Sequence, residues 1–346
     1  MRYRRLVLTF IAALALFAGG NYLVWKCWTE ALLSDRQYQG GDLARMGYID
    51  TSKQYRKNSV DLPRRHVELT DYTGGTFDVI TIGDSFSNGG AGGRNRFYQD
   101  YIASINGMNV LNIPPFKELD MLSTISTMLN SGFFDSLHPR YVLVSCHEWS
   151  FIPALASPLD FSTSMKPEDF KRLKPMDYNV PHPVVNFINT GNAKFVLNKL
   201  LYQFSDHAYF SRVYKRKLKK PMFTAPDDES LLFLRTKTIS DHKALQSLND
   251  NLNNLADRLS TKGITLVFMP CVDKFTMYSE FLVDNPYPVS TFFEDLNKLP
   301  KRYRIINTKN ILLDPIRRGE KDIFYADDTH WSWKASEAIF NYYQFN

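Results

Sequence analysis

Residue types that together perform nucleophilic catalysis occur in two short segments far apart in the chain. The first, GDSFSNGG, places Ser85 directly after a Gly-Asp pair, and the second, DIFYADDTHWSW, contains Asp327, Asp328 and His330. A serine hydroxyl at its ordinary pKa is a poor nucleophile, so it needs a neutral imidazole as base and a carboxylate that orients the imidazole. We therefore predict Ser85 as the nucleophile and His330 as its base.

The sequence offers two neighbouring aspartates as the carboxylate that orients the His330 imidazole. A short loop allows an Asp two or three positions before His330 to reach its Nδ1 while Nε2 faces Ser85, so Asp327 and Asp328 are both candidates. Each segment has a simpler interpretation, since Gly, Asp and Ser are common turn residues and an acidic loop often lies at the surface. No HxxxH or CxxC pattern accompanies the acidic loop, so we expect no metal and no cofactor.

Five short segments rich in β-branched residues and bounded by turn residues predict buried strands. They span residues 77–83, 108–113, 140–147, 264–270 and 303–308. One helix is predicted to end at Gly132, and a second, with a leucine stripe from Leu245 to Leu259, at Gly263. Alternating strands and helices predict an α/β fold, with a parallel sheet and helices on both faces. Ser85 would follow the carboxyl end of the first strand, where such sheets bind ligands.

The amino terminus carries an uncharged apolar run at residues 6–25, preceded by MRYRR and followed by Lys26. As a helix, this run spans roughly the 30 Å of a bilayer's hydrocarbon core. Basic residues before it favour a cytoplasmic amino terminus. We predict an uncleaved transmembrane anchor at 1–26 in the inner membrane, with the remaining chain on the periplasmic or extracellular side. A cleaved signal peptide is the alternative.

The remaining chain divides by composition. Residues 27–75 are polar with few periodic apolar positions, which predicts a stalk and a connecting segment. Residues 76–346 form the predicted catalytic domain, interrupted at about 150–235 by an insertion rich in Pro, Phe, Tyr and Lys that would form a lid or a partner surface. Lys and Arg number 42 against 36 Asp and Glu, spread along the chain, so no nucleic-acid partner is expected.

The arrangement of a serine after the first strand and an Asp-His loop after the last resembles the SGNH/GDSL hydrolase superfamily over about residues 75–340. The resemblance implies a three-layer sandwich around a parallel sheet. The stretches GDSFS, MPCVDKFTMYSEF at 269–281 and DTHW at 328–331 are similar to the alginate O-acetyltransferase group of this superfamily. In that group the orienting Asp stands two positions before the His, which implies Asp328. The broader superfamily places it three positions before, which implies Asp327.

Two features depart from these families. The alginate enzymes carry the Asp-His loop before the serine, whereas here the serine comes first. The Gly and Asn blocks that supply oxyanion donors in the superfamily are not evident. By position, Asn88 and Asn112 are candidate donors beside the Ser85 amide, and His147 and Glu148 are candidates to line the pocket.

The resemblance implies an extracytoplasmic serine O-acyltransferase that transfers acetyl groups to a cell-surface or exported polysaccharide through an acyl-serine. Acetyl-CoA is not at hand outside the cytoplasm, so the acyl donor would have to be delivered across the membrane. The resemblance implies a membrane-bound O-acyltransferase as the partner that does so. Two alternatives stay open: a carbohydrate esterase or deacetylase of the same fold, and a non-catalytic polysaccharide-binding scaffold. Transferase and esterase share their catalytic residues and differ in water exclusion and acceptor binding.

Overall fold

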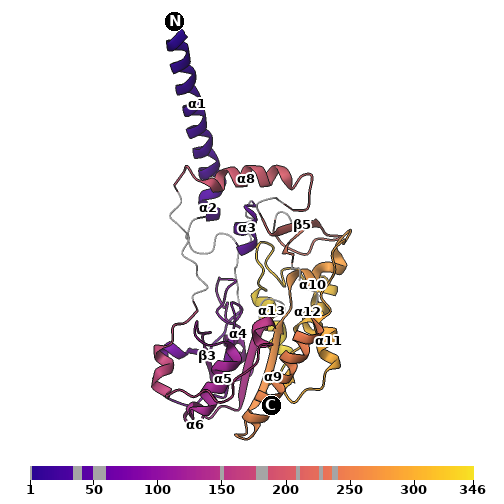
Figure 1. The fold of residues 1–346 in the computed structure, drawn as a ribbon. Coiled ribbons are helices and arrows are strands. Elements are labelled where there is room, and N and C mark those ends of the chain that lie inside the picture. Colours follow the sequence, from indigo (N-terminus) through magenta and orange to yellow (C-terminus); the bar gives the residue numbers. More distant parts are fainter. Residues whose placement is uncertain are drawn as a thin grey trace.

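The computed structural model describes residues 2–33, 41–49, 60–148, 152–176, 186–207, 211–225, 229–235 and 241–346. Within these ranges the chain is an α/β protein with a long apolar helix at its amino terminus (Figure 1). Residues 34–40 and 50–59 of the predicted stalk, and parts of the predicted insertion, lie outside the described residues.

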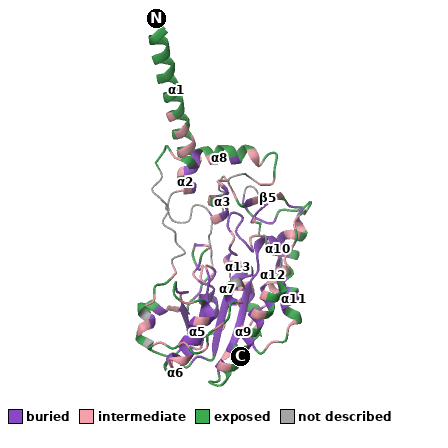
Figure 2. Ribbon diagram, viewed as in Figure 1, coloured by how far each residue is buried: buried purple, intermediate pink, exposed green. Residues whose placement is uncertain are grey.

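A six-stranded parallel sheet forms the centre of the main domain, in the order β1-β3-β2-β4-β7-β8. Its strands are β1 Val67–Glu68, β2 Val79–Gly83, β3 Val110–Ile113, β4 Tyr141–His147, β7 Thr265–Cys271 and β8 Arg304–Ile305. Every residue of β2, β3 and β4 is buried, as expected for parallel strands covered on both faces (Figure 2). The five predicted strands are all present, and the predicted α/β class is confirmed.

The helices pack in two groups. The first group is α5 Met121–Asn130, α6 Phe133–Leu137, α7 Ile152–Leu155, α9 His242–Ser260 and α11 Phe292–Lys298, and the second is α4 Tyr98–Ile105, α12 Thr308–Arg317 and α13 Trp333–Tyr342. The chain moves from β2 to β3 in one direction along the sheet and from β3 through β4 to β7 in the other. Because crossovers between parallel strands are right-handed, α4 covers one face, and α5 and α9 cover the opposite face.

Two glycines end helices as predicted. Gly132 and Gly263 both have φ +73°, a left-handed conformation that costs glycine little. The leucine stripe of α9, from Leu245 to Leu259, is buried against the sheet and its neighbouring helices. Local periodicity therefore specifies both the length of α9 and the face that it buries.

Residues 60–72 lie along the edge of the sheet, although the sequence assigned them to a connecting segment. Val67 of β1 pairs with Leu111 of β3, and Leu62 and Leu69 belong to the main core. A strand of two residues shows no alternation that a sequence can reveal. The segment is therefore part of the main domain.

Above the carboxyl edge of the sheet lies a second layer, made of short elements and the long amino-terminal helix that projects from it (Figure 1). Its members are α1 Arg2–Val24, η1 Trp25–Thr29, α2 Glu30–Leu33, α3 Asp42–Gly47, α8 Thr190–Leu201 and an antiparallel hairpin of β5 Val213–Lys217 and β6 Ser230–Leu234. A small separate core of Leu32, Ala44 and Phe195 joins α2, α3 and α8. The remaining short helices are η2 Leu69–Asp71, η3 Pro167–Arg172, α10 Lys274–Tyr278 and η4 Ser279–Phe281.

The helix that runs from Arg2 to Leu33 is long and apolar enough to cross a membrane, and none of its most apolar window is buried against the protein. Among the described residues, the elements between 152 and 235 add no strand to the main sheet, because β5 and β6 form a separate two-stranded sheet.

Candidate active site

Ser85 lies in the turn directly after β2, at the carboxyl edge of the sheet. The turn begins at Gly83, where a Cβ atom would lie 2.1 Å from Ser145 Oγ and 2.2 Å from Ser87 Oγ, so no larger residue fits. β2 and β4 are neighbours at the point where the strand order reverses, and open α/β sheets bind ligands in the crevice at this point.

The buried carboxylate of Asp84 ties this turn to the end of β4. It accepts hydrogen bonds from the backbone N–H of Phe86 at 3.0 Å and of His147 at 2.7 Å. Burial raises the pKa of Asp84 above its ordinary value, although these hydrogen bonds oppose the rise. Asp84 therefore fixes the position of the nucleophile turn and does not itself contact the base.

The three predicted residues Ser85, His330 and Asp328 form a continuous hydrogen-bonded chain. His330 Nε2 lies 2.7 Å from Ser85 Oγ, and His330 Nδ1 lies 2.6 Å from Asp328 Oδ1. Asp328 Oδ1 also accepts the backbone N–H of His330 at 3.0 Å. This is the arrangement in which an imidazole takes a proton from a serine hydroxyl while a carboxylate holds its tautomer and orientation.

Asp327 has a different position from Asp328. Its Oδ2 accepts a hydrogen bond from the backbone N–H of Gly41 at 2.8 Å. Gly41 approaches so closely that a Cβ atom there would lie 2.0 Å from Asp327 O. Of the two carboxylates that the sequence left open, Asp328 therefore holds the imidazole and Asp327 holds the segment before α3.

Asp42, the first residue of α3, completes the surroundings of His330 and was missed by the sequence analysis. Its Oδ1 accepts the backbone N–H of Thr329 at 2.7 Å, its Oδ2 bonds the Thr329 hydroxyl, and Oδ2 lies 3.8 Å from His330 Nδ1. Nothing in the local sequence around Asp42 indicates this role, because the contact joins residues almost at opposite ends of the chain.

Asp42, Asp328 and His330 also offer three possible metal-ligand atoms within 4.8 Å of one another. The 2.6 Å separation of Asp328 Oδ1 and His330 Nδ1 is a hydrogen-bond distance. An ion bound by both atoms would have to replace the bond that orients the ring, so the geometry favours proton transfer over metal binding.

Carboxylates dominate the electrostatics of His330. Burial lowers its pKa, but the charge and hydrogen bond of Asp328, with further contributions from Asp42 and Asp84, raise the pKa to about 9. Burial and the nearby charge of Asp328 raise the pKa of Asp42 to about 6. The site thus stabilises the imidazolium that forms when the serine hydroxyl loses its proton.

A buried lysine supports the loop that carries Asp328 and His330. Lys274 Nζ, in α10, donates hydrogen bonds to the carbonyl oxygens of Tyr325 at 2.7 Å, Ala326 at 2.8 Å and Asp328 at 3.0 Å. Burial lowers the pKa of Lys274 to about 8, although nearby carboxylates oppose this change. A charged residue inside the apolar stretch 269–281 was the available sequence signal for this role.

The backbone amides after Ser85 are mostly engaged within the turn. The N–H groups of Ser87 and Asn88 donate to Asp84 O, and that of Gly90 donates to Ser85 O at 2.8 Å. Among the described residues, the N–H of Ser85 itself has no acceptor, which leaves it available to an oxyanion.

The Asn112 side chain, a candidate oxyanion donor by position, is committed elsewhere. It is fully buried in β3, donates to both Glu68 oxygens at 3.0 and 3.2 Å, and accepts from Thr81 and Gln99 at 2.9 Å. Asn112 therefore stabilises the sheet edge and does not face the site. Asn88, the other candidate, is half-buried in the turn itself, where its backbone N–H donates to Asp84 O at 3.2 Å.

Gly90 faces the reacting atoms. A Cβ atom at this position would lie 2.6 Å from His330 Nε2 and 2.9 Å from Ser85 O. The residue itself is exposed. Glycine at position 90 therefore allows the turn to pass close to His330 without a side chain that would press on the ring.

His147 and Glu148, at the end of β4, form a buried cluster with α10. His147 Nε2 lies 3.3 Å from Asp273 Oδ2, and Thr276 Oγ1 donates to Glu148 Oε1 at 2.5 Å. Burial and the charge of Asp273 raise the pKa of Glu148 to about 7. Phe86 lies between the two histidines, with its ring centroid 5.7 Å from that of His147 and 4.7 Å from that of His330. The cluster packs beneath the site, and its ring contacts hold the turn after Ser85.

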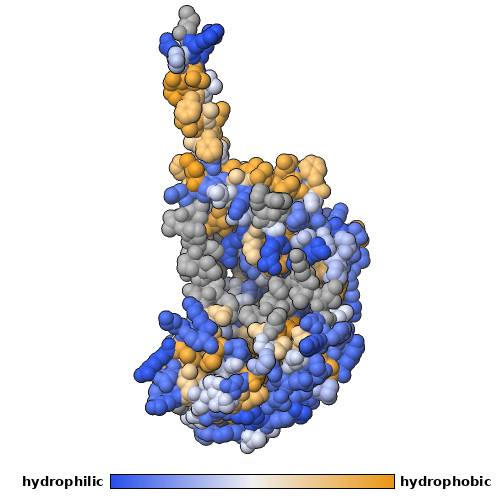
Figure 3. Space-filling view, in the orientation of Figure 1, coloured by the Kyte–Doolittle hydropathy of each residue, from blue (hydrophilic) through white to orange (hydrophobic). Residues whose placement is uncertain are grey.

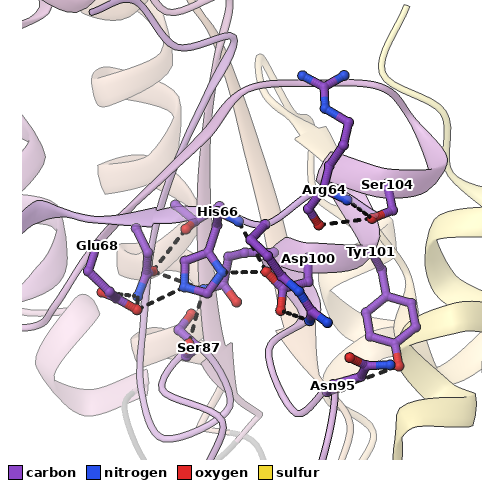
Figure 4. A network of polar contacts seen from close by, with 12 residues as sticks. Arg64, His66, Glu68, Ser87, Asn95, Asp100, Tyr101 and Ser104 are labelled. Carbon is purple, nitrogen blue, oxygen red and sulfur yellow. Dashed lines mark hydrogen bonds and ion pairs between the residues drawn. The ribbon is translucent and has the colours of Figure 1, made fainter. Parts of the chain in front are cut away.

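Behind the nucleophile turn, His66 lies between two carboxylates (Figure 4). Its Nδ1 is 2.7 Å from Asp100 Oδ1 and its Nε2 is 2.9 Å from Glu68 Oε1. Burial opposes a charge on the ring, but the hydrogen bonds to Asp100 and Glu68 raise the pKa of His66 to about 9. His66 is therefore a cation that links the sheet edge to α4.

A chain of side-chain contacts runs from this cluster toward the nucleophile. Asn112 Nδ2 donates a hydrogen bond to the Glu68 carboxylate. Gln99 Nε2 donates to Asn112 Oδ1 at 2.9 Å and to the backbone carbonyl of Ser87 at 3.0 Å. All these groups are buried or half-buried, so each hydrogen bond is costly to leave unmade. The network fixes the backbone two residues beyond Ser85.

No protein-family model matches this chain, and no curated protein matches it. Its class therefore rests on its own architecture and geometry. The chain is an α/β protein with an apolar amino-terminal helix and a Ser-His-Asp arrangement at the carboxyl edge of a parallel sheet.

Proposed function

We propose that this protein is a membrane-anchored, extracytoplasmic serine O-acyltransferase of the SGNH-hydrolase type. The observation that carries the proposal is the hydrogen-bonded chain from Ser85 Oγ through His330 to Asp328, at 2.7 and 2.6 Å. The sheet order and the position of Ser85 after β2 support it, because both agree with the architecture that the sequence resemblance implies.

The reaction has two steps. His330 Nε2 takes the hydroxyl proton as Ser85 Oγ bonds the acyl carbon, and the donor's ester bond breaks as its leaving oxygen receives that proton. A sugar hydroxyl then attacks the acyl-serine, loses its proton to His330 and takes the acyl group, and Ser85 recovers its proton. The Ser85 N–H is the donor positioned to stabilise the oxyanion of both steps.

The substrates follow from the resemblance and the anchor. The acyl group is proposed to be acetyl and the acceptor a cell-surface or exported polysaccharide. The donor is proposed to be a membrane-bound O-acyltransferase in the same membrane, with α1 as a single-pass inner-membrane anchor and the domain outside the cytoplasm. The helix from Arg2 to Leu33, the one membrane-length apolar helix among the described residues, supports this topology.

The test uses the full-length chain in detergent micelles with 4-nitrophenyl acetate as acyl donor. We expect Ser85→Ala and His330→Ala to abolish acetyl release and labelling by a fluorophosphonate. Ser260→Ala and His242→Ala, outside the site, are matched controls that retain activity. Equal activity in Ser85→Ala and wild type would overturn the proposal.

An added oligosaccharide separates the transferase from the esterase. Acetylated oligosaccharide that depends on Ser85 supports acyl transfer, whereas release of acetate alone supports a carbohydrate esterase or deacetylase. A folded wild-type chain that neither reacts with the probe nor releases acetate supports a strictly partner-dependent transferase or the polysaccharide-binding scaffold.

A further inference from the structure

Helix α8 carries an apolar face that the described residues do not cover. The helix and its flanking residues expose large hydrophobic side chains by 40 to 82%: Phe187, Ile188, Val196, Leu197, Leu200 and Phe204. Figure 3 shows this apolar surface along α8, on the side from which α1 projects. Six neighbouring large apolar side chains in one short segment are more than the scattered exposed residues of an ordinary surface.

The opposite face of α8 packs against η1 and the end of α1. The buried Asn192 side chain accepts a hydrogen bond from Thr29 Oγ1 at 2.5 Å and donates to Asn21 Oδ1 at 3.1 Å. The ring of Phe195 stacks on Trp28 with centroids 5.7 Å apart. These contacts fix the position of α8 relative to α1.

A third contact fixes α8 to the main domain. Asn198 is fully buried, and its Nδ2 donates to Gly47 O, at the end of α3, at 2.7 Å. The polar face of α8 therefore points to the domain and its apolar face points away from it. Figure 1 shows α8 lying across the base of α1.

The contact with α1 places α8 at the depth of a membrane surface. Tyr22, Trp25 and Trp28 stand at the end of the apolar run of α1, and such aromatic side chains gather where a helix leaves the hydrocarbon core. Phe187 contacts Tyr22 with ring centroids 6.1 Å apart, so the start of α8 lies at the same level.

Basic residues accompany the apolar face. Lys194 and Lys199 both belong to α8, and Lys199 Nζ lies 5.2 Å from the Trp28 ring. A helix with one apolar face and lysines at its border is typical of an amphipathic helix in the headgroup region. Lysines at that depth also attract anionic lipids.

We propose that α8 lies in the outer interface of the bilayer that α1 crosses, with its apolar face toward the acyl chains. This inference rests on the proposed membrane anchor. It gives the protein two membrane contacts, one across the bilayer and one along its surface. Because α3 contacts both α8 and the loop that carries Asp328, the active site is held at a constant height above the lipid.

The experiment measures the depth of a fluorescent label on the full-length chain in vesicles of phosphatidylcholine and phosphatidylglycerol. Single cysteines are introduced by Leu200→Cys, Leu14→Cys or Ser260→Cys on a Cys27→Ser background, because Cys146 and Cys271 are buried. Each is labelled with a nitrobenzoxadiazole dye. Ser260 ends α9 near the amino edge of the sheet and is the control outside the membrane.

We expect lipids with a nitroxide near the headgroup to quench the label at 200 at least twofold, and lipids with a deep nitroxide to quench the label at 14. Neither lipid should quench the label at 260. Quenching at 14 without quenching at 200 would overturn the role of α8 and leave the anchor intact. Absence of quenching at both would overturn the anchor as well. A label at 200 that is shielded from lipid nitroxide and from aqueous iodide indicates contact with a second copy, which also contradicts the proposal.

Discussion

The backbone N–H of Asp42 donates a hydrogen bond to Asp328 Oδ2 at 3.4 Å, across 286 positions of sequence. Asp328 orients the His330 ring, so the first turn of α3 forms part of the active site. The segment that joins α1 to the main domain therefore does more than connect them. It places the Asp42 carboxylate beside His330, and the backbone N–H groups of Gly41 and Asp42 hold the carboxylates of Asp327 and Asp328.

The neighbouring carboxylates Asp328 and Asp327 provide a matched pair of substitutions. Asp328→Asn should lower kcat by about 10² to 10⁴-fold, because the amide no longer stabilises the imidazolium and favours the wrong tautomer. Asp327→Asn keeps an acceptor for the Gly41 N–H and should change kcat by less than about threefold. Steady-state hydrolysis of 4-nitrophenyl acetate measures both. Equal losses in the two variants would contradict the assigned roles.

Asp42 should set the pH dependence of the reaction. The pKa of His330 is about 9, and only the neutral ring acts as a base, so kcat/KM of wild type should rise with pH toward about 9. Asp42→Asn removes a negative charge 3.8 Å from His330 Nδ1, and this should move the rising limb to lower pH by roughly one unit. Asp42→Glu keeps the charge and is the control. If the rise of kcat/KM with pH were the same in Asp42→Asn as in wild type, Asp42 would not affect the pKa of His330.

Gly90→Ala should block the site without unfolding the protein. The added Cβ would lie 2.6 Å from His330 Nε2, so the imidazole has to move away from Ser85. A displacement of about 1 Å can cost about 10²-fold in rate, and we expect a loss of that size in kcat/KM. Gly19→Ala, where no atom lies within 4 Å of the added Cβ, is the control. The two variants should unfold at the same temperature. Full activity of Gly90→Ala would contradict the close approach of Gly90 to His330.

His66 should make stability depend on pH. Its pKa is about 9 in the folded protein against an ordinary 6.5, so its stabilising contribution is complete below about pH 6.5 and is lost as pH rises through 9. A gap of this size corresponds to a contribution on the order of 3 kcal/mol. His66→Gln removes the cation between Asp100 and Glu68, so the free energy of unfolding should fall less steeply as the pH rises from 6.5 through 9.

The pKa of His330 is also raised to about 9, so both histidines titrate in one pH range. The comparison is therefore made in a His330→Ala background, by thermal unfolding of the full-length chain between pH 6 and 10. An equal decline with and without His66 would refute its contribution.

Much of the fold could be predicted from the sequence. The five main strands and the ends of the helices at Gly132 and Gly263 follow from local periodicity and backbone preference, which act within a few residues. The strand β1 and the hairpin of β5 and β6 could not be predicted, because their pairing partners and not their own patterns define them.

The candidate site likewise has residues that the sequence predicts and contacts that only the tertiary structure shows. The residues themselves indicated Ser85 and His330, since few side chains serve as nucleophile and base, and the order of strands and helices placed Ser85 at the carboxyl edge of a sheet. Only the tertiary structure shows that Asp328 contacts the ring and that Asp42 approaches the ring from α3. It also shows that the described residues leave one apolar face of α8 uncovered. These relationships depend on packing between segments distant in sequence, and a local pattern carries no information about which distant segment will be its neighbour.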